Sequence, residues 1–168
     1  DLKTFAALGV YGLSAITAVT AQNTMGVMAI MPISADVVTA QIEAVASDMS
    51  VHATKTGMLV NAAIVEAVAA AIEALNLPLV VVDPVMLATS GEPLLDDDGV
   101  RAMCAELLPR ALVVTPNIPE AEILSGRAIT SIEQARAAAA EIHQRSGAAV
   151  VITLAAGSSN TNLIAAAN

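Results

Sequence analysis

The stretch LVVTPNIPEAEIL, from 112 to 124, places an asparagine and a glutamate three residues apart, directly after an apolar run. Asn117 and Glu120 fit a capping box, in which the asparagine accepts a backbone N–H of the first helical turn and the glutamate reaches back to the cap. The same pair fits a site where Glu120 acts through water on Mg²⁺ and the helix N-terminus attracts phosphate oxygens. Spacing alone favours the cap and leaves the metal site open.

A second acidic side chain, Asp83, ends the apolar run LVVVD and is followed by Pro84. A carboxylate in this position either begins a turn, as Asp-Pro pairs often do, or orders Mg²⁺ and phosphate charge. The residue pair leaves these two interpretations equally open. The glycine-containing loop SGEPLL (90–95) follows and is by itself a weak signal for ligand binding.

Two residues nearer the N-terminus suit a flat heteroaromatic ligand. The amide of Gln22 can donate and accept hydrogen bonds side by side, which matches the edge of an aminopyrimidine. Met58 can pack against the face of such a ring. Both residues also have a purely structural interpretation, because glutamine often bonds backbone groups and methionine is a common core residue.

The elements that must position these residues alternate between buried strands and amphipathic helices. Apolar, β-branched runs predict strands at 12–20, 27–33, 51–59, 78–86, 111–115 and 148–154. Capping residues and helical spacing predict helices at 34–49, 61–77, 96–108, 116–125 and 131–146. This alternation predicts one α/β domain over 1–168, a three-layer α/β/α fold with a mostly parallel central sheet.

In such a sheet, ligands bind beyond the carboxyl ends of the strands. The candidate residues all fall in segments just past a predicted strand: Thr20 to Asn23, Gly57 and Met58, Asp83 to Met86, and Thr115 to Glu120. We therefore expect them to gather at one edge of the sheet.

Composition limits the partners. Sixteen acidic and seven basic residues give a formal net charge of −9, which would repel a nucleic-acid backbone. No charge falls between Lys3 and Asp36, but polar residues such as Gln22 interrupt that run, so we expect no membrane span. The lone Cys104 cannot form an internal disulfide, and we expect a cytoplasmic protein.

Taken together, four segments are more specific than any single residue. In their order and spacing they resemble the hydroxymethylpyrimidine/phosphomethylpyrimidine kinases, the thiamine-biosynthesis members of the ribokinase-like superfamily. The resemblance covers about residues 1 to 153. It rests on DLKTFAALGVYGLSAITAVTAQNT (1–24), KTGML (55–59), VVVDPVMLATSGEPLL (80–95) and LLPRALVVTPNIPEAEIL (107–124).

This resemblance implies ATP-dependent phosphorylation of 4-amino-5-hydroxymethyl-2-methylpyrimidine and then of its monophosphate, with Mg²⁺. It also implies roles for matching positions. Gln22 would read the pyrimidine edge, and four residues would line or approach the pyrimidine pocket: Met58, Val85, Thr20 and Asp1. Three residues would serve Mg²⁺ and the ATP phosphates: Asp83, Asn117 and Glu120.

The chain also departs from the family pattern. The family has a strand and a Gly-rich loop before the position of Asp1, and a later Gly-Thr-Gly-Cys-type loop that forms the anion hole. Neither is found in this sequence, and the residues from Leu154 onward match the family poorly. We therefore expect a fold incomplete at both ends, with the catalytic residues of the anion-hole loop outside this chain.

Two other functions remain open. Pyridoxal kinases share this fold and overlap in substrate geometry, although Gln22 and the KTGM segment favour the aminopyrimidine. A non-catalytic vitamin-binding module would keep the pocket residues and lack the anion hole. Relatives of this fold commonly form dimers, so we expect a homodimer.

Overall fold

A computed structural model describes residues 1–88 and 90–153 and the backbone of 163–165. Its main sheet has five strands in the order β3-β4-β5-β6-β7, and the first four are parallel. The last strand, β7, runs antiparallel to β6. The strands are β3 (Thr54–Thr56), β4 (Val80–Val82), β5 (Val113–Val114), β6 (Ala149–Ile152) and β7 (Leu163–Ala165). The predicted α/β class with a mostly parallel sheet is confirmed.

Helices connect these strands and begin close to the predicted starts. They are α2 (Ala35–Asp48), α3 (Ala62–Ala74), α4 (Asp97–Ala102), α5 (Ile118–Ser125) and α6 (Ile132–Ser146). The side chains of four cap residues each accept a backbone N–H from the first turn: Asn61, Asp96, Asn117 and Ser131. After α4 the chain continues as a π-helical turn, Met103–Leu107, and a 3₁₀ turn, Leu108–Arg110.

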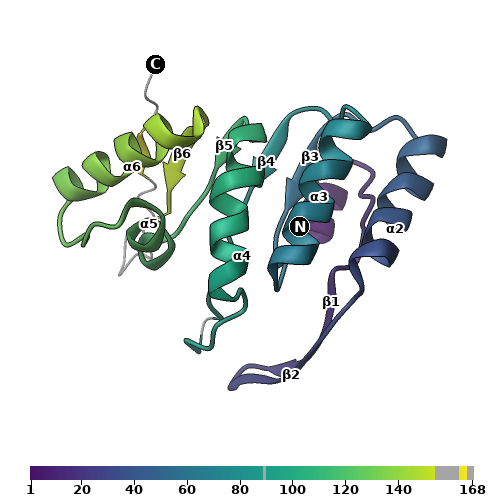
Figure 1. The fold of residues 1–168 in the computed structure, drawn as a ribbon, viewed down its shortest axis with the longest axis horizontal. Coiled ribbons are helices and arrows are strands. Elements are labelled where there is room, and N and C mark those ends of the chain that lie inside the picture. Colours follow the sequence, from purple (N-terminus) through teal and green to yellow (C-terminus); the bar gives the residue numbers. More distant parts are fainter. Residues whose placement is uncertain (89, 154–162, 166–168) are drawn as a thin grey trace.

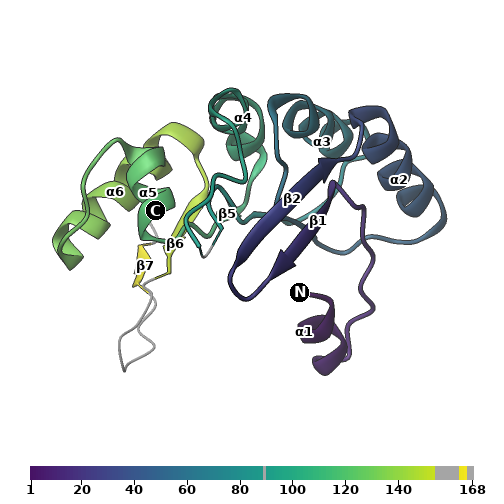
Figure 2. The same ribbon diagram turned by 90° about the horizontal axis from the view of Figure 1, so that it is seen from below.

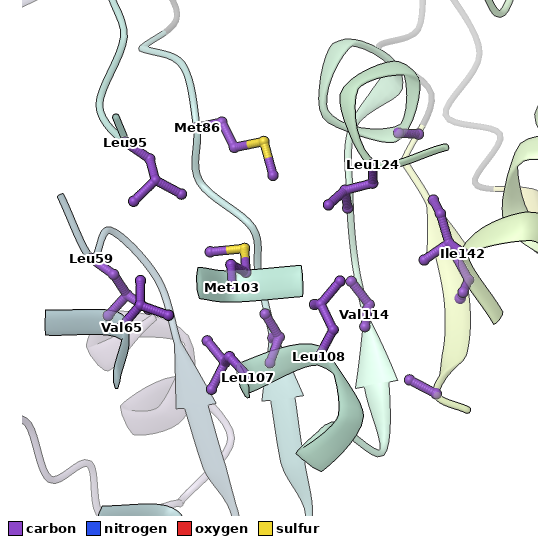
Figure 3. Packing of buried hydrophobic residues seen from close by; sticks show 14 of the residues in the cluster. Leu59, Val65, Met86, Leu95, Met103, Leu107, Leu108, Val114, Leu124 and Ile142 are labelled. Atoms are coloured by element: carbon purple, nitrogen blue, oxygen red, sulfur yellow. The ribbon is translucent and has the colours of Figure 1, made fainter. Parts of the chain in front are cut away.

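The hydrophobic core lies between the sheet and these helices. Figures 1 and 2 show α2, α3, α4 and α6 along one side of the sheet, with the short α1 (Leu2–Ala7) on the opposite side. Val82, Val114 and Val150 are completely buried on the helix side. Figure 3 shows side chains from neighbouring elements filling this layer, including Val65, Met103, Leu107 and Ile142.

The other face of the sheet is less covered in the part of the chain that the structure describes. Val81, Val113 and Val151 point away from the buried valines and are only half-buried. Successive strand residues face opposite sides of a sheet, so this pattern marks two faces that differ in burial. Continuous runs such as VVV therefore reflect a parallel sheet whose second face is also apolar.

The prediction of a buried strand over 12–20 was wrong. Strand β1 begins only at Ala18, extends to Asn23, and pairs with β2 (Gly26–Pro32) in a separate antiparallel ribbon. Figure 2 shows this ribbon apart from the main sheet. Its apolar residues are largely exposed, and Val19 lies opposite Met31 with about half of each side chain accessible. An apolar run indicates extended structure but not the sheet it joins.

No helix in the described ranges is long and apolar enough to cross a membrane.

Candidate functional site

Three parallel strands bring charged side chains together at their carboxyl ends. Lys55 lies in β3, and Asp83 directly follows β4. The Nζ atom of Lys55 lies 2.9 Å from Oδ2 of Asp83 and 2.8 Å from Oδ2 of Asp1. The structure therefore places Asp1, from the start of the chain, beside the sheet edge that the sequence predicted for ligand binding.

The helix that follows β5 begins with the predicted capping box. The backbone N–H of Glu120 donates to Oδ1 of Asn117 at 3.0 Å, and the backbone N–H of Asn117 donates to Oε2 of Glu120 at 2.9 Å. The other carboxylate oxygen of Glu120 accepts the backbone N–H of Met86 at 3.3 Å. The interpretation of Asn117 and Glu120 as a capping box is confirmed. The contact of Glu120 with Met86 was not predicted.

Glu120 is a buried acid, with only 3% of its surface accessible. Burial raises the pKa of this carboxyl, because the charged form loses its hydration. The backbone N–H groups of Asn117 and Met86 oppose that change, while the negative charge of Asp83 raises the pKa further. Asp83 and Glu120 therefore interact electrostatically, and the sequence had predicted both to serve the same ligand.

Two of the predicted pyrimidine-pocket residues line the same end of the sheet. Met58 follows β3 and Val85 follows β4, and both are half-buried. The hydroxyl of Thr17 donates to the backbone oxygen of Met58 at 2.6 Å, which fixes the chain just before β1 against this edge. The backbone N–H of Val85 donates to the backbone oxygen of Asp83 at 2.9 Å.

Two further predicted pocket residues, Thr20 and Gln22, lie on the ribbon. Thr20 is half-buried opposite Ile30, whereas Gln22 is exposed next to an irregularity in the strand register. The ribbon tip approaches the loop after β4, because a Cβ atom added at Gly26 would lie 3.2 Å from Oε1 of Glu92. The ribbon thus reaches the SGEPLL loop. The pyrimidine contacts of Gln22 and Thr20 stay predictions.

The donor atoms at this edge are of the kind that Mg²⁺ accepts. The residues with described positions include no group of three or more acidic, histidine or cysteine side chains suited to holding a metal alone. Mg²⁺ is usually bound by one or two carboxylates together with substrate phosphates and water. Asp83 with the cap at Asn117 and Glu120 fits that mode, and the metal roles themselves stay predictions.

Sequence reasoning missed Lys55 as a site residue. The KTGML segment contributed to the family resemblance, but the lysine itself had no predicted partner. One sequence signal could have identified it. Lys55 lies in a predicted strand, and the predicted site acids Asp1 and Asp83 were expected near the carboxyl end of that strand. Strand β3 has only three residues, too few for the sequence alternation to show which way Lys55 points.

A parallel sheet with acids and a lysine at its carboxyl edge defines an α/β protein whose ligand site lies beyond the strand ends. The family described as phosphomethylpyrimidine kinase matches residues 1–166, and the chain belongs to this family. A hydroxymethylpyrimidine/phosphomethylpyrimidine kinase of Rhizobium meliloti is 52% identical over 152 residues, covering 90% of this chain and 57% of that relative.

Solved structures agree with this assignment. The crystal structure of phosphomethylpyrimidine kinase from Clostridium difficile is 36% identical, with a TM-score of 0.86 over 98% of this chain and 72% of that one. The ADP complex of Bacillus subtilis pyridoxal kinase is 31% identical, with a TM-score of 0.84 over 99% of this chain and 64% of that one. The chain thus spans little more than half of its curated relative and about two thirds of these structures.

Proposed function

We propose that this chain forms the greater part of an ATP-dependent kinase that phosphorylates 4-amino-5-hydroxymethyl-2-methylpyrimidine and its monophosphate in thiamine biosynthesis. The observation that carries the proposal is the gathering of Asp83, Lys55 and Glu120 at the carboxyl ends of three parallel strands, in a chain of this family. Phosphoryl transfer depends mostly on positioning and charge stabilisation, which such an edge can provide.

On the phosphate side, Asp83 and the start of α5 would hold Mg²⁺ and the phosphates of ATP. When bound, Mg²⁺ neutralises charge on the phosphate oxygens. Asn117 orders the first turn of α5, whose N-terminus favours anions. Both oxygens of Glu120 accept backbone N–H groups, so its proposed action on the metal goes through a water molecule, using remaining lone pairs.

On the substrate side, Met58 and Val85 would form walls of the pyrimidine pocket, and Thr20 another wall. Gln22 would bond the aminopyrimidine edge. Asp1 would complete this side, and its contact with Lys55 supports the assignment by holding it at the strand ends.

The direct test is ADP release with the hydroxymethylpyrimidine as acceptor, measured for the protein as its gene encodes it and for residues 1–168 alone. We expect turnover in the first and strongly reduced turnover in the second, because the anion-hole loop of the family is not found in this sequence. Losing a single donor to a developing charge costs about 3–4 kcal/mol of barrier. Comparable turnover by the gene-encoded protein and by residues 1–168 would contradict the proposal that residues 1–168 lack the anion-hole loop.

Pyridoxal phosphorylation is the second candidate, and the similarity to Bacillus subtilis pyridoxal kinase favours testing it. Competition between pyridoxal and the hydroxymethylpyrimidine in one reaction measures the ratio of their kcat/KM values directly. We expect preference for the pyrimidine, reduced by Gln22→Met with little change for pyridoxal. Binding of both compounds without turnover in the gene-encoded protein would instead support a vitamin-binding module.

We also propose a cytoplasmic homodimer. The exposed apolar side chains of the ribbon, including Val19 and Met31, support self-association, because large apolar residues gathered on one surface often mark an interface. The single cysteine among 168 residues supports a reducing compartment.

A further inference from the structure

The register of the parallel sheet places Lys55 and Asp83 side by side. Lys55 in β3 pairs with Val81 in β4, and Asp83 follows Val81 by two residues. Because residues two apart along a strand face the same side, the lysine and the aspartate are diagonal neighbours on one face of the sheet. The backbone N–H of Asp83 also donates to the oxygen of Thr56 at 3.3 Å. The pairing of β3 with β4, both in the interior of the sequence, therefore sets this contact.

The ammonium group of Lys55 occupies an oxygen of Asp83 that a metal ion could use. Its Nζ atom lies 2.9 Å from Oδ2 of Asp83, and the two side chains are only 27% and 33% exposed. Partial burial makes the attraction between these charges stronger than it would be on an open surface. An ammonium group and a divalent cation repel each other, so both cannot favourably contact the same carboxylate. A metal ion arriving alone at Asp83 would have to displace Lys55 or bind beside its charge.

Lys55 also changes the charge that a phosphate would meet. The negative charge of Asp83 reaches Glu120, whose pKa it helps to raise. Two carboxylates without a nearby cation would repel the phosphates of ATP, and Lys55 offsets one of them. Within the described ranges, no group of three or more acidic, histidine or cysteine side chains is suited to hold a metal ion. A metal ion at this edge would therefore need phosphate oxygens as further ligands.

We propose that Lys55 is a positioning residue that acts as the built-in counter-ion of Asp83, so that a divalent cation binds there well only together with the nucleotide. The assignment of Asp83 to the metal rests on the proposed function. Without nucleotide, Lys55 neutralises Asp83 and disfavours a second cation. With nucleotide bound, the phosphates add negative charge with which the ammonium group can pair, so releasing Asp83 costs less. A lysine suits this exchange, because its compact ammonium group sits on a flexible stem.

The test measures binding of Mn²⁺ by electron paramagnetic resonance, in the gene-encoded protein and without nucleotide. Mn²⁺ prefers the same oxygen ligands as Mg²⁺. Lys55→Met, with Lys55→Gln as a second neutral variant, should bind Mn²⁺ about tenfold more tightly, because a positive charge beside a divalent ion is lost. Lys55→Arg keeps the charge and should stay close to the parent. Arg136→Met, at an exposed position of α6, removes one positive charge elsewhere and should change nothing.

A second measurement adds a non-hydrolysable ATP analogue. The analogue should raise the affinity of the parent for Mn²⁺, and this gain should be about tenfold smaller in Lys55→Met, because the lone ion already binds well there. In an Asp83→Asn background the effect of Lys55→Met on Mn²⁺ affinity should disappear. A residue with a merely structural role would not tighten metal binding when it is removed.

Unchanged or weaker binding of Mn²⁺ in both neutral variants overturns the proposal, and so does an undiminished effect of Lys55→Met in the Asp83→Asn background. Failure of the parent to bind Mn²⁺ even with the ATP analogue overturns it as well, together with the metal role of Asp83. If the parent binds Mn²⁺ with the analogue as expected but does not phosphorylate the pyrimidine, the proposed function falls, while the Mn²⁺ affinities still decide the role of Lys55.

Discussion

Glu120 and Met86 are joined by a buried hydrogen bond of 3.3 Å from the Met86 backbone to the Glu120 carboxylate. This contact links the first turn of α5 to the segment after β4, so one side chain sets the spacing between two strand ends. The side chain of Met86 lies in the hydrophobic core, which anchors the donor (Figure 3). The distance between the proposed phosphate site and Val85 therefore depends on Glu120, which the sequence predicted only as part of a capping box.

Glu120→Ala is expected to destabilise the protein by about 2–4 kcal/mol. The substitution removes the acceptor of the buried Met86 N–H and of the partly buried Asn117 N–H, and each unsatisfied buried group costs about 1–3 kcal/mol. Urea unfolding followed by circular dichroism measures the change. Glu66→Ala, at an exposed position of α3, is the matched control and should stay within about 0.5 kcal/mol of the parent. A loss of stability as small as that of Glu66→Ala would show that Glu120 holds neither the start of α5 nor the segment after β4.

The raised pKa of Glu120 predicts a pH dependence of stability with a defined sign. In the folded protein this carboxyl keeps its proton to higher pH than in the unfolded chain, because burial disfavours the charged form. Folding is therefore favoured by protonation, and this contribution is lost as pH rises from the ordinary glutamate pKa through the raised one.

Glu120→Gln isolates this effect, since it removes the titrating group and keeps the side-chain shape. The unfolding free energy of the parent minus that of Glu120→Gln should fall as pH rises through that window and level off above it. A difference that rises with pH would mean that the N–H groups of Asn117 and Met86 outweigh burial.

Asn117 allows the cap and the proposed phosphate role to be separated. Asn117→Ala removes the acceptor for the Glu120 N–H and should cost about 1 kcal/mol of stability. Asn117→Ser keeps a capping oxygen but loses the amide NH₂. If the amide also serves the phosphates, both variants raise KM for ATP while only Asn117→Ala lowers the melting temperature. Unchanged KM for ATP in both variants would leave Asn117 as a cap alone.

The elements with strong local signals could be predicted from the sequence. The cap at Asn61, the capping box at Asn117 and the αL glycine that ends α6 at Gly147 all depend on neighbouring residues. Such signals are readable because the physics that produces them acts within one helical turn. The valine run of β4 was equally clear, since its composition is typical of a parallel strand.

The parts of the fold and of the candidate site that the sequence did not predict depend on contacts between distant segments. Nothing local shows that Lys55 meets Asp1, 54 residues earlier, or that Glu120 accepts the N–H of Met86. The run 12–20 illustrates the same limit. Its apolar residues predicted a core strand, but β1 pairs with β2 and places Val19 on an exposed ribbon. Side-chain alternation could predict extended structure there but not its partner.

That exposed ribbon supplies the last prediction. Val19 and Met31 are cross-strand partners with accessible side chains, and the proposed homodimer would cover them. Met31→Lys places a charge in that contact and should weaken self-association at least about tenfold, because an unpaired charge is costly to bury. Met25→Lys, in the turn at the ribbon tip, is the control and should leave association unchanged. Sedimentation equilibrium of the gene-encoded protein measures both. Equal association constants for the two variants would place the dimer contact elsewhere, and a monomeric parent would reject the homodimer.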